Sequence, residues 1–415
     1  MTVPTRAFGA LLSPSEARER YLAALEAAPR GVEEVPVHAA LGRVLAADAV
    51  AGVDLPPFDR SAVDGWAVRA ADVAGAAVDR PVSLRHVGEV TMGAEAGLRV
   101  GTGQAVRVPT GGMLPPGADA VVMQEDVTFR PPEVLVRRAV DVGANVVPRG
   151  VDVRAGEVVL ARGRRLRPAD LGILAGLGYA RIAVTVRPRV AVVSTGDEVV
   201  PPGAPLGPGQ VRDMNSAALA GAVEAAGGVA DPLGIVRDDR GMLEATLSAA
   251  VSSHEMVLVS GGSSVGEQDS VAEAIGALGP PGIIVHGVAV RPGKPTILAA
   301  AGRVPVIGLP GNPVSALVIF DLFARPVLER LLGMDPAARP WDRVRARVAA
   351  PVPAAGARED HRRVRLEARP DGLWAQPLPA ASQVLTSLVR ADGIVVVPAG
   401  GPGYAAGDEV EVRLL

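Results

Sequence analysis

Four short loops between residues 190 and 320 carry residue types that could bind a phosphate-bearing ligand. Each loop follows an apolar run and is rich in glycine, proline or hydroxyl side chains: 194–198 (STGDE), 260–269 (SGGSSVGEQD), 291–295 (RPGKP) and 309–315 (LPGNPVS). Strands that alternate with tight loops and helices build a parallel sheet, and its ligands lie outside the carboxyl ends of the strands. Carboxylates, hydroxyls, a lysine and free backbone amides at one edge therefore indicate an anion-binding crevice.

The loop over 260–269 offers several consecutive backbone amides. Gly261 and Gly262 allow the positive φ angles and close approach that an anion-binding nest requires, and Ser263 and Ser264 add hydroxyls. Asp269 follows at the start of the next expected helix. The alternative is a tight turn in which Asp269 only caps that helix.

Three carboxylates, Glu198, Asp238 and Asp269, follow three different expected strands. In one parallel sheet they would meet at the same edge, where they would repel one another unless a cation joined them. Oxygen ligands of this kind suit Mg²⁺, which also takes substrate phosphates. The sequence therefore predicts a site for Mg²⁺ or another divalent cation. A solvated turn at 197–198 and a helix cap at 238–239 are the alternatives.

Two further loops provide groups for anions. Arg291 and Lys294 flank a Pro-Gly turn, and cations beside a metal–phosphate site neutralise non-bridging oxygens. Pro310, Gly311 and Asn312 end a strand and begin a helix, whose N-terminal amides bind anions readily. Plain turns are the alternative for both. The absence of a Walker motif, or of G-x-G-x-x-G opening a helix, disfavours P-loop and ordinary NAD enzymes.

Composition excludes several classes of function. The 415 residues carry a formal charge of −3 and no long block of like charge, so no nucleic-acid partner is expected. Cysteine is absent, which removes thiolate metal sites and cysteine nucleophiles. No uncharged apolar run reaches the roughly 18 residues of a membrane span, and residues 1–10 lack a signal-peptide core. We expect no membrane contact and a cytoplasmic location.

The pattern of apolar residues predicts how these loops are positioned. Ser13, Pro14 and Glu16 form a helix start with a capping box. A second helix after Pro168 is expected to pack on this first one, so that the glycine-rich region between them is an inserted β domain. From residue 187 strands and helices alternate as in a doubly wound sheet. The expected strands are 189–193, 229–236, 256–259, 283–290 and 304–307, and the expected helices are 216–226, 241–252, 270–277 and 314–332. Short strands follow residue 333.

Read together, six segments closely resemble the MoeA family of molybdopterin molybdenumtransferases, which includes the C-terminal domain of gephyrin. They are PPFDRSAVDGWAVRAAD from Pro56, VPTGGMLPPGADAVVMQED from Val108, VSTGDEVV from Val193, SGGSSVGEQD from Ser260, RPGKP from Arg291 and GLPGNPVSALVIF from Gly308. Their order and spacing fit along essentially the whole chain. The last four partly resemble the smaller Mog-type adenylyltransferases, whereas the first two point to MoeA.

The resemblance implies a multidomain α/β plus β fold. Its parts would be an elongated helical and β dimerisation domain (1–51 plus 141–186), an inserted β-rich domain (52–140), a Mog-like doubly wound α/β domain that binds molybdopterin (187–332) and a C-terminal β-barrel-like domain (333–415). The capped first helix would belong to the dimerisation domain. It also implies a homodimer whose active site is shared between chains, with Asp64 and Thr110 supplied by the partner.

The resemblance further implies a transferase that takes adenylylated molybdopterin and molybdate, inserts the metal at the dithiolene and releases AMP. Asp64, Glu198, Asp238 and Asp269 would be catalytic, the last three through the divalent cation. Arg363 and Ser382 would bind molybdate. The expected substrate-binding residues are Thr110, Ser194, Thr195, Gly196, Gly261, Gly262, Ser263, Ser264, Arg291, Lys294, Pro310, Gly311 and Asn312. Transient contacts with a molybdopterin adenylyltransferase and with cofactor-accepting enzymes are expected.

Two alternatives remain open on the sequence. A Mog-like molybdopterin adenylyltransferase shares the α/β domain, but it leaves the flanking β domains without a role. A gephyrin-like scaffold without activity need not keep the carboxylates, which are all present here. Arg291 also departs from the family pattern, in which lysine is usual, and so presents a planar fork in place of a point donor.

Overall fold

The computed structural model describes residues 11–261, 267–336 and 343–415, without the side chains of 267–269. Contacts divide the chain into two compact units. The first contains the chain up to Glu34, Gly42–Ala46 and Ala183–Leu415, and the second contains Val35–Leu41 and Ala47–Ile182. The chain first crosses between the units within β1 (Val32–Pro36) and last crosses within β12 (Arg181–Thr185).

The first unit is built on a six-stranded sheet. Its order is β16 (Val229–Val236), β13 (Arg189–Thr195), β17 (Met256–Ser260), β21 (Val304–Leu309), β20 (Ile297–Ala301) and β18 (Pro281–His286). The first four strands are parallel, and β20 is antiparallel to both of its neighbours. Five of the six strands therefore end at the same edge, as the sequence predicts.

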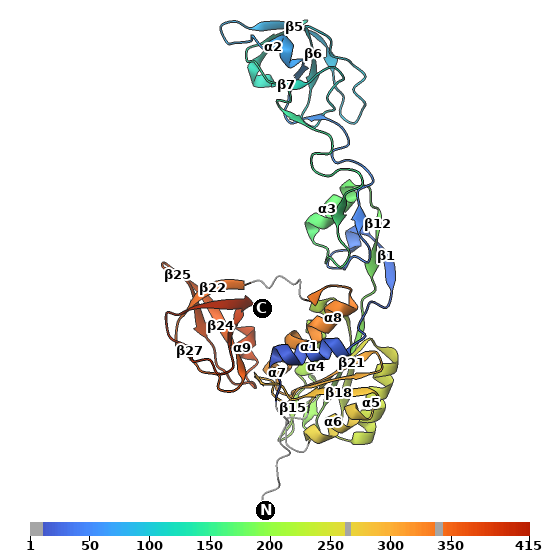
Figure 1. Cartoon of the computed structure of the whole chain (residues 1–415), viewed down its shortest axis with the longest axis vertical. Coiled ribbons are helices and arrows are strands. Elements are labelled where there is room, and N and C mark those ends of the chain that lie inside the picture. Colours follow the sequence, from blue (N-terminus) through green and yellow to red (C-terminus); the bar gives the residue numbers. More distant parts are fainter. Residues whose placement is uncertain (1–10, 262–266, 337–342) are drawn as a thin grey trace, which may run out of the picture. The chain divides into compact units, whose positions relative to one another are not determined.

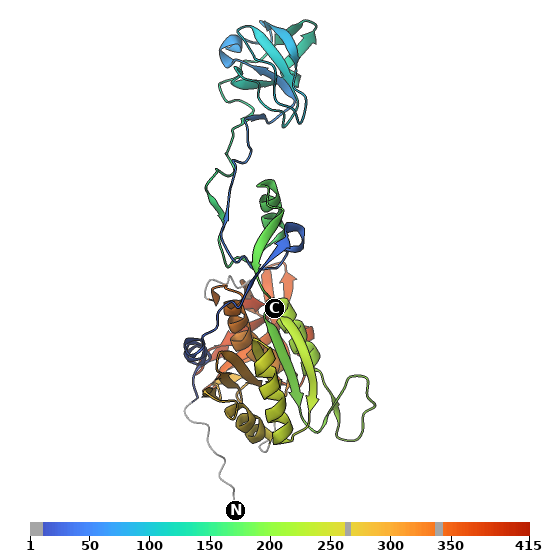
Figure 2. The ribbon, with the colours of Figure 1, turned by 90° about the vertical axis from the view of Figure 1, so that its right-hand side faces the viewer.

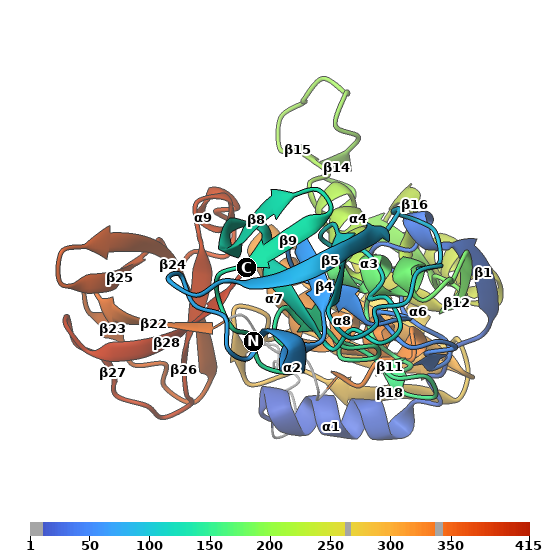
Figure 3. The same cartoon turned by 90° about the horizontal axis from the view of Figure 1, so that it is seen from above.

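Helices cover both faces of this sheet (Figure 1). Side chains of a strand alternate between faces, so Val190 and Val192 of β13 pack with α4 (Asn215–Ala226), α7 (Pro313–Ile319) and α8 (Arg325–Leu331). Ala191 and Val193 pack on the other face with α5 (Arg240–Ser253) and α6 (Glu267–Gly276). The expected doubly wound α/β arrangement is confirmed. The loop between β14 (Val199–Val200) and β15 (Val211–Arg212) extends away from α4 (Figures 2 and 3).

The structure of this unit differs from the sequence-based expectations at three places. Strand β20 was not expected, because its all-apolar sequence carries no alternation. The expected strand over 283–290 is broken: β18 ends at His286, Gly287 takes a positive φ of 85°, and Val290–Arg291 forms the separate strand β19. The expected helix over 314–332 contains a π-helical segment, Phe320–Ala324, before α8. Pro326, in the first turn of α8, lacks the N–H that an uninterrupted α-helix would use.

A closed barrel follows at the C-terminus (Figure 3). Its strands are β24 (Glu359–Arg369), β25 (Gly372–Pro377), β22 (Arg343–Val348), β28 (Glu409–Leu414) and β26 (Gly393–Val397), and β26 pairs back with β24 to close it. The expected C-terminal β-barrel-like fold is confirmed. Strand β19 also pairs with β24, so the chain before β20 contributes to the barrel sheet. The short elements β23 (Val352–Pro353), β27 (Gly403–Tyr404) and α9 (Thr386–Val389) lie in the same segment.

Helix α1 (Pro14–Ala24) begins as predicted, with the reciprocal Ser13–Glu16 capping box. Its buried residues Ala17 and Tyr21 belong to the core of the α/β sheet, and the Tyr21 hydroxyl donates to the carbonyl of Ala299 at 2.9 Å. The expected packing of α1 on α3 (Pro168–Gly176) is wrong, because α3 belongs to the second unit and contacts the 3-10 helix Val37–Ala39 there.

The second unit contains the β-rich segment that the glycine spacing predicts (Figure 1). Its six-stranded sheet has the order β7 (Ala120–Met123), β4 (Gly65–Val68), β6 (Gln104–Val108), β5 (Val82–Glu89), β9 (Glu133–Val136) and β8 (Val127–Arg130). Trp66, Leu84 and Val122 are among the buried residues of its core. The remaining elements are β2 (Ala49–Val50), β3 (Arg60–Ser61), α2 (Ala70–Val73), the 3-10 helix Gln124–Asp126, β10 (Val146–Val147) and β11 (Val158–Leu160).

Candidate functional site

The ends of β13 and β16 bring Thr195 and Asp238 together. The Thr195 hydroxyl donates to Asp238 Oδ1 at 2.8 Å, and the backbone N–H of Asp197 donates to Asp238 Oδ2 at 3.2 Å. The neighbouring Asp239 instead caps α5 by accepting from the N–H of Met242 at 2.8 Å. Of the two adjacent carboxylates, Asp238 is thus the one directed to the strand-end edge.

Ser194 belongs to a hydrogen-bonded chain that the sequence reasoning did not identify. Its hydroxyl lies 2.9 Å from that of Ser216, which donates to Asp213 Oδ2 at 2.5 Å. Asp213 also accepts from the backbone N–H of Ser216 at 3.0 Å. The signal was an aspartate three residues before a serine at a helix start, a spacing typical of helix capping. This chain fixes the end of β13 to the start of α4.

Two glycines at this edge leave no room for a side chain. A Cβ on Gly196 would lie 2.7 Å from Glu198 Oε2, and a Cβ on Gly261 would overlap the carbonyl oxygen of Thr195. Glu198 itself is exposed. The predicted residues Gly262, Ser263 and Ser264 lie outside the described residues. Asp269 lies in the first turn of α6, which begins at Glu267, but its side chain is not described.

Asn215 joins two of the predicted loops, although it was not among the predicted site residues. Its amide Nδ2 donates to Ser260 Oγ and to the carbonyl of Gly311, both at 2.7 Å. Asn215 is the first residue of α4, at the same sheet edge as the ends of β17 and β21. The sequence feature that could have identified Asn215 as a site residue is its position directly after the loop that follows an expected strand.

Two of the three predicted ligands of the divalent cation have described side chains. Glu198 and Asp238 lie at the same edge of the sheet, and carboxylate oxygens are ligands that suit Mg²⁺. Each Asp238 oxygen accepts one hydrogen bond and keeps a further lone pair. Among the side chains that the structure describes, no group of three or more His, Asp or Glu is placed to hold a metal ion. The third predicted ligand, Asp269, is not one of those side chains.

The loops at 291–295 and 310–315 line a cavity of about 530 Å³ together with residues 380–383, which we call the barrel segment. The predicted residues Arg291, Lys294, Pro310, Asn312 and Ser382 are all in its wall. Arg358, which was not predicted, also lines it. Two arginines and a lysine around one cavity favour an anionic ligand. The other lining residues are Pro292, Gly293, Pro295, Ser315, Ala380, Ala381 and Gln383.

Direct hydrogen bonds hold the barrel segment against the loop after β21. The Asn312 side chain donates to Ser382 Oγ at 3.1 Å, and the backbone N–H of Val314 donates to the carbonyl of Ser382 at 3.3 Å. Gly293 lies close to Ile319, because a Cβ on Gly293 would lie 2.5 Å from Ile319 Cδ1. Both predicted loops are thereby fixed around the cavity.

Arg363, the other predicted molybdate residue, is not part of the cavity wall. It lies in β24 with 1% of its surface exposed, and its guanidinium donates to the carbonyl of Pro379 at 2.6 Å and to Ser387 Oγ at 3.2 Å. Burial lowers the pKa of Arg363, and the neighbouring charge of Arg362 adds to this effect. Arg363 therefore supports the segment that carries Ser382.

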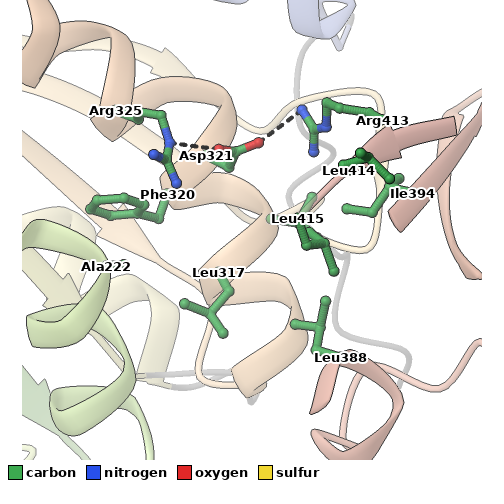
Figure 4. Close-up of a pocket in the computed structure, with 11 residues that line it drawn as sticks. Ala222, Leu317, Phe320, Asp321, Arg325, Leu388, Ile394, Arg413, Leu414 and Leu415 are labelled. Carbon is green, nitrogen blue, oxygen red and sulfur yellow. Dashed lines mark hydrogen bonds and ion pairs between the residues drawn. The ribbon is translucent and has the colours of Figure 1, made fainter. Parts of the chain in front are cut away.

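A second cavity, of about 270 Å³, has none of the predicted residues in its wall. It is lined mainly by apolar side chains of α4, α7, the π-helical segment, α9 and the C-terminal strand. In Figure 4, Asp321 lies between Arg325 and Arg413. Its carboxylate accepts from Arg325 Nε at 2.7 Å and pairs with Arg413 at 2.8 Å. This cavity marks where the barrel packs on the α/β helices.

In the second unit, Asp64 and Thr110 contact each other. Asp64 Oδ1 accepts from the backbone N–H of Thr110 at 2.7 Å and from its hydroxyl at 2.9 Å. These two bonds, the backbone bond first, lower the pKa of Asp64. Backbone bonds between Ser61 and residues 111–112 hold the two loops together. Two motifs that are far apart in the sequence thus meet in one exposed pair of side chains.

Comparisons with known proteins agree with this architecture. The MoeA N-terminal region (domains I and II) matches residues 12–178, a "Probable molybdopterin binding domain" matches 191–330, and the MoeA C-terminal region (domain IV) matches 345–415. A molybdopterin molybdenumtransferase 2 of Mycobacterium tuberculosis is 36% identical over 91% of this chain and 94% of its own. The molybdopterin molybdenumtransferase of Nostoc is 36% identical over 92% of this chain and 88% of its own.

A solved structure of the molybdopterin biosynthesis MoeA protein of Pyrococcus horikoshii OT3 has the same fold. It superposes with a TM-score of 0.83 and 32% identity, covering 98% of this chain and 100% of its own. The chain is therefore a multidomain protein that combines a doubly wound α/β domain with β domains. It belongs to the MoeA family, which places it among the transferases of molybdenum cofactor biosynthesis.

None of the helices in the described part of the chain has the length and apolar character that a membrane span requires.

Proposed function

We propose that this chain inserts molybdate into adenylylated molybdopterin and releases AMP. The observation that carries the proposal is the cavity of about 530 Å³ with Arg291, Lys294 and Arg358 in its wall, next to the edge that carries Glu198 and Asp238. A tetrahedral oxyanion needs cations and hydroxyl donors, and Ser315 and Ser382 supply hydroxyls in the same wall. Molybdate would occupy this cavity.

The strand-end edge would bind the adenylylated pterin. The segments that would hold its phosphates carry Ser194, Thr195, Gly196 and the loop from Gly261 to Ser264. On the side of the cavity, the substrate would contact Pro310, Gly311 and Asn312. Glu198, Asp238 and Asp269 would hold Mg²⁺ or another divalent cation, which would neutralise phosphate charge on the departing AMP. Thr195 and the Asp197 amide fix the Asp238 carboxylate for that purpose.

Asp64 and Thr110 would complete the site from a second copy of the chain. Their paired side chains form an exposed anionic group in the second unit, which is compatible with a function at an interface. The proposal thus includes a cytoplasmic homodimer and transient contacts with a molybdopterin adenylyltransferase and with cofactor-accepting enzymes. The proposal keeps the expected division of the chain into four domains. Helix α1 is assigned to the α/β domain, because it packs in the core of that domain.

The test measures AMP release from adenylylated molybdopterin with and without molybdate. We expect molybdate-dependent release by the wild type and none by Asp269→Ala, because a ligand of the cation is removed. Glu273→Ala is the matched control, since Glu273 lies on the same helix and pairs with Arg240 at its surface. Full turnover by Asp269→Ala would remove that residue from the mechanism. Formation of adenylylated molybdopterin from ATP would support the adenylyltransferase alternative instead.

A further inference from the structure

Asp360 is a carboxylate buried next to the cationic cavity. It lies in the barrel strand β24 with 2% of its surface exposed. Asp360 Oδ2 forms an ion pair at 2.7 Å with Arg362, whose side chain is 10% exposed, and lies 4.0 Å from Arg291 Nη1. A buried carboxylate is costly unless it is paired with cations. Asp360 therefore has a fixed place between two arginines.

The backbone brings Arg291 to this carboxylate. Strand β19 (Val290–Arg291) pairs in parallel with β24, and Arg291 is opposite Asp360 in the register. The N–H of Glu359 donates to the carbonyl of Ala289 at 2.9 Å, next to this pairing. Asp360 thus lies at the junction where the loop 291–295 meets the barrel. A displacement of either segment would separate Asp360 from Arg291.

Arg291 has donors for two partners at the same time. A guanidinium carries five N–H groups in a rigid plane, so a carboxylate on one side leaves others for an anion. The Arg291 side chain is 48% exposed and lines the cavity of about 530 Å³. At 4.0 Å, the contact with Asp360 is an ion pair longer than a hydrogen bond, so this carboxylate does not engage the Arg291 N–H donors directly. Arg362 balances the charge of Asp360, so the cavity remains cationic.

We propose that Asp360 is a positioning residue that orients Arg291 for oxyanion binding in this cavity. Asp360 does not touch the oxyanion itself. Its carboxylate holds the guanidinium plane toward the cavity, so that less rotational freedom is lost when the anion binds. This inference rests on the proposed function, because it takes molybdate as the anion that occupies the cavity.

The test is a double-mutant cycle on the full chain, read out by calorimetric titration with molybdate. We expect Asp360→Asn and Arg291→Ala each to raise the molybdate Kd about tenfold, and the double variant to raise it no further than Arg291→Ala alone. The number of sites per chain stays at the wild-type value, which separates a loss of affinity from a loss of folded protein. In turnover, the KM for molybdate rises while kcat is retained.

Two further variants keep the test decisive if Asp360→Asn does not fold. Asp360→Glu keeps the charge that pairs with Arg362 but displaces the carboxylate by one methylene, and we expect a smaller rise in Kd, about threefold. Asp371→Asn is the control, because Asp371 lies on the same barrel and pairs with Arg347 at its surface. It should bind molybdate like the wild type.

The outcomes separate the two levels of the proposal. Wild-type affinity in both Asp360 variants, or additive losses in the double variant, would overturn the positioning role while the wild type still binds molybdate. A wild type that binds no molybdate would overturn the proposed function and this inference together. An Asp360→Asn protein with fewer sites but unchanged affinity would show a purely structural role.

Discussion

The side chain of Asn312 donates a hydrogen bond to Ser382 Oγ at 3.1 Å, which joins the loop after β21 to the barrel segment 380–383. The N–H of Val314 strengthens the same connection by donating to the carbonyl of Ser382. Two segments 70 residues apart in sequence therefore form one wall of the cationic cavity. The position of Ser382 depends on this contact.

Removing the Asn312 amide should weaken binding of the oxyanion. We expect Asn312→Ala to raise the KM for molybdate by about tenfold, since a lost hydrogen bond of roughly 1.4 kcal/mol corresponds to that factor. The measurement is the rate of AMP release as a function of molybdate concentration. Ser252→Ala is the control, because the Ser252 hydroxyl donates within α5 to the carbonyl of Ser248. An unchanged KM in Asn312→Ala would show that the hydrogen bond between Asn312 and Ser382 does not contribute to anion binding.

Gly261 cannot accept a side chain without a shift of the neighbouring strand. The Cβ of Gly261→Ala would overlap the Thr195 carbonyl, so we expect a loss of about 1–3 kcal/mol in the free energy of unfolding together with reduced turnover. Urea denaturation and AMP release measure the two effects. Gly221→Ala in α4 meets nothing within 4 Å and should be neutral or stabilising by up to about 1 kcal/mol. Equal stability of both variants would contradict the close approach.

The contact between Asp64 and Thr110 predicts a specific pH dependence. The backbone and hydroxyl bonds from Thr110 lower the pKa of Asp64, so the carboxylate stays ionised below its ordinary titration range. If ionised Asp64 is needed, activity is retained above that lowered pKa and is lost as the pH falls through it. Thr110→Val removes the hydroxyl bond, so the acid limb of the kcat/KM profile should move to higher pH. An acid limb that does not move would argue against a role for ionised Asp64.

Asp321 should contribute to the packing of the barrel on the α/β helices. Its carboxylate contacts Arg325 and Arg413, and all three side chains are largely buried. Asp321→Ala leaves two arginines without this counter-charge, and we expect a loss of about 2–4 kcal/mol in the free energy of unfolding. Glu411→Ala, which breaks an exposed pair with Arg343, should cost less than about 1 kcal/mol. Denaturant unfolding compares the two, and equal losses would show that Asp321 has no special role.

Local patterns in the sequence determined much of this structure. Capping residues identified the start of α1 at Pro14, since the Ser13–Glu16 box depends on neighbours only three residues apart. Apolar runs between turn residues identified β13, β16, β17 and β21, so the predicted loops were assigned correctly to one sheet edge. Their residue types also predict an anionic ligand. These features follow from short-range geometry and from the repeat of buried side chains.

Only the tertiary structure decided which distant segments share a surface. The pairing of β19 with β24 sets Arg291 opposite Asp360, and it is a contact between residues about 70 positions apart that no local pattern encodes. Closure of the barrel likewise brings Ser382 and Arg358 to the cavity and buries Arg363 behind it. Tyr21 packs on the face of the sheet that α4, α7 and α8 cover, because that face is apolar and the Ala299 carbonyl accepts the Tyr21 hydroxyl. Such choices depend on complementary surfaces that form only when the chain is folded.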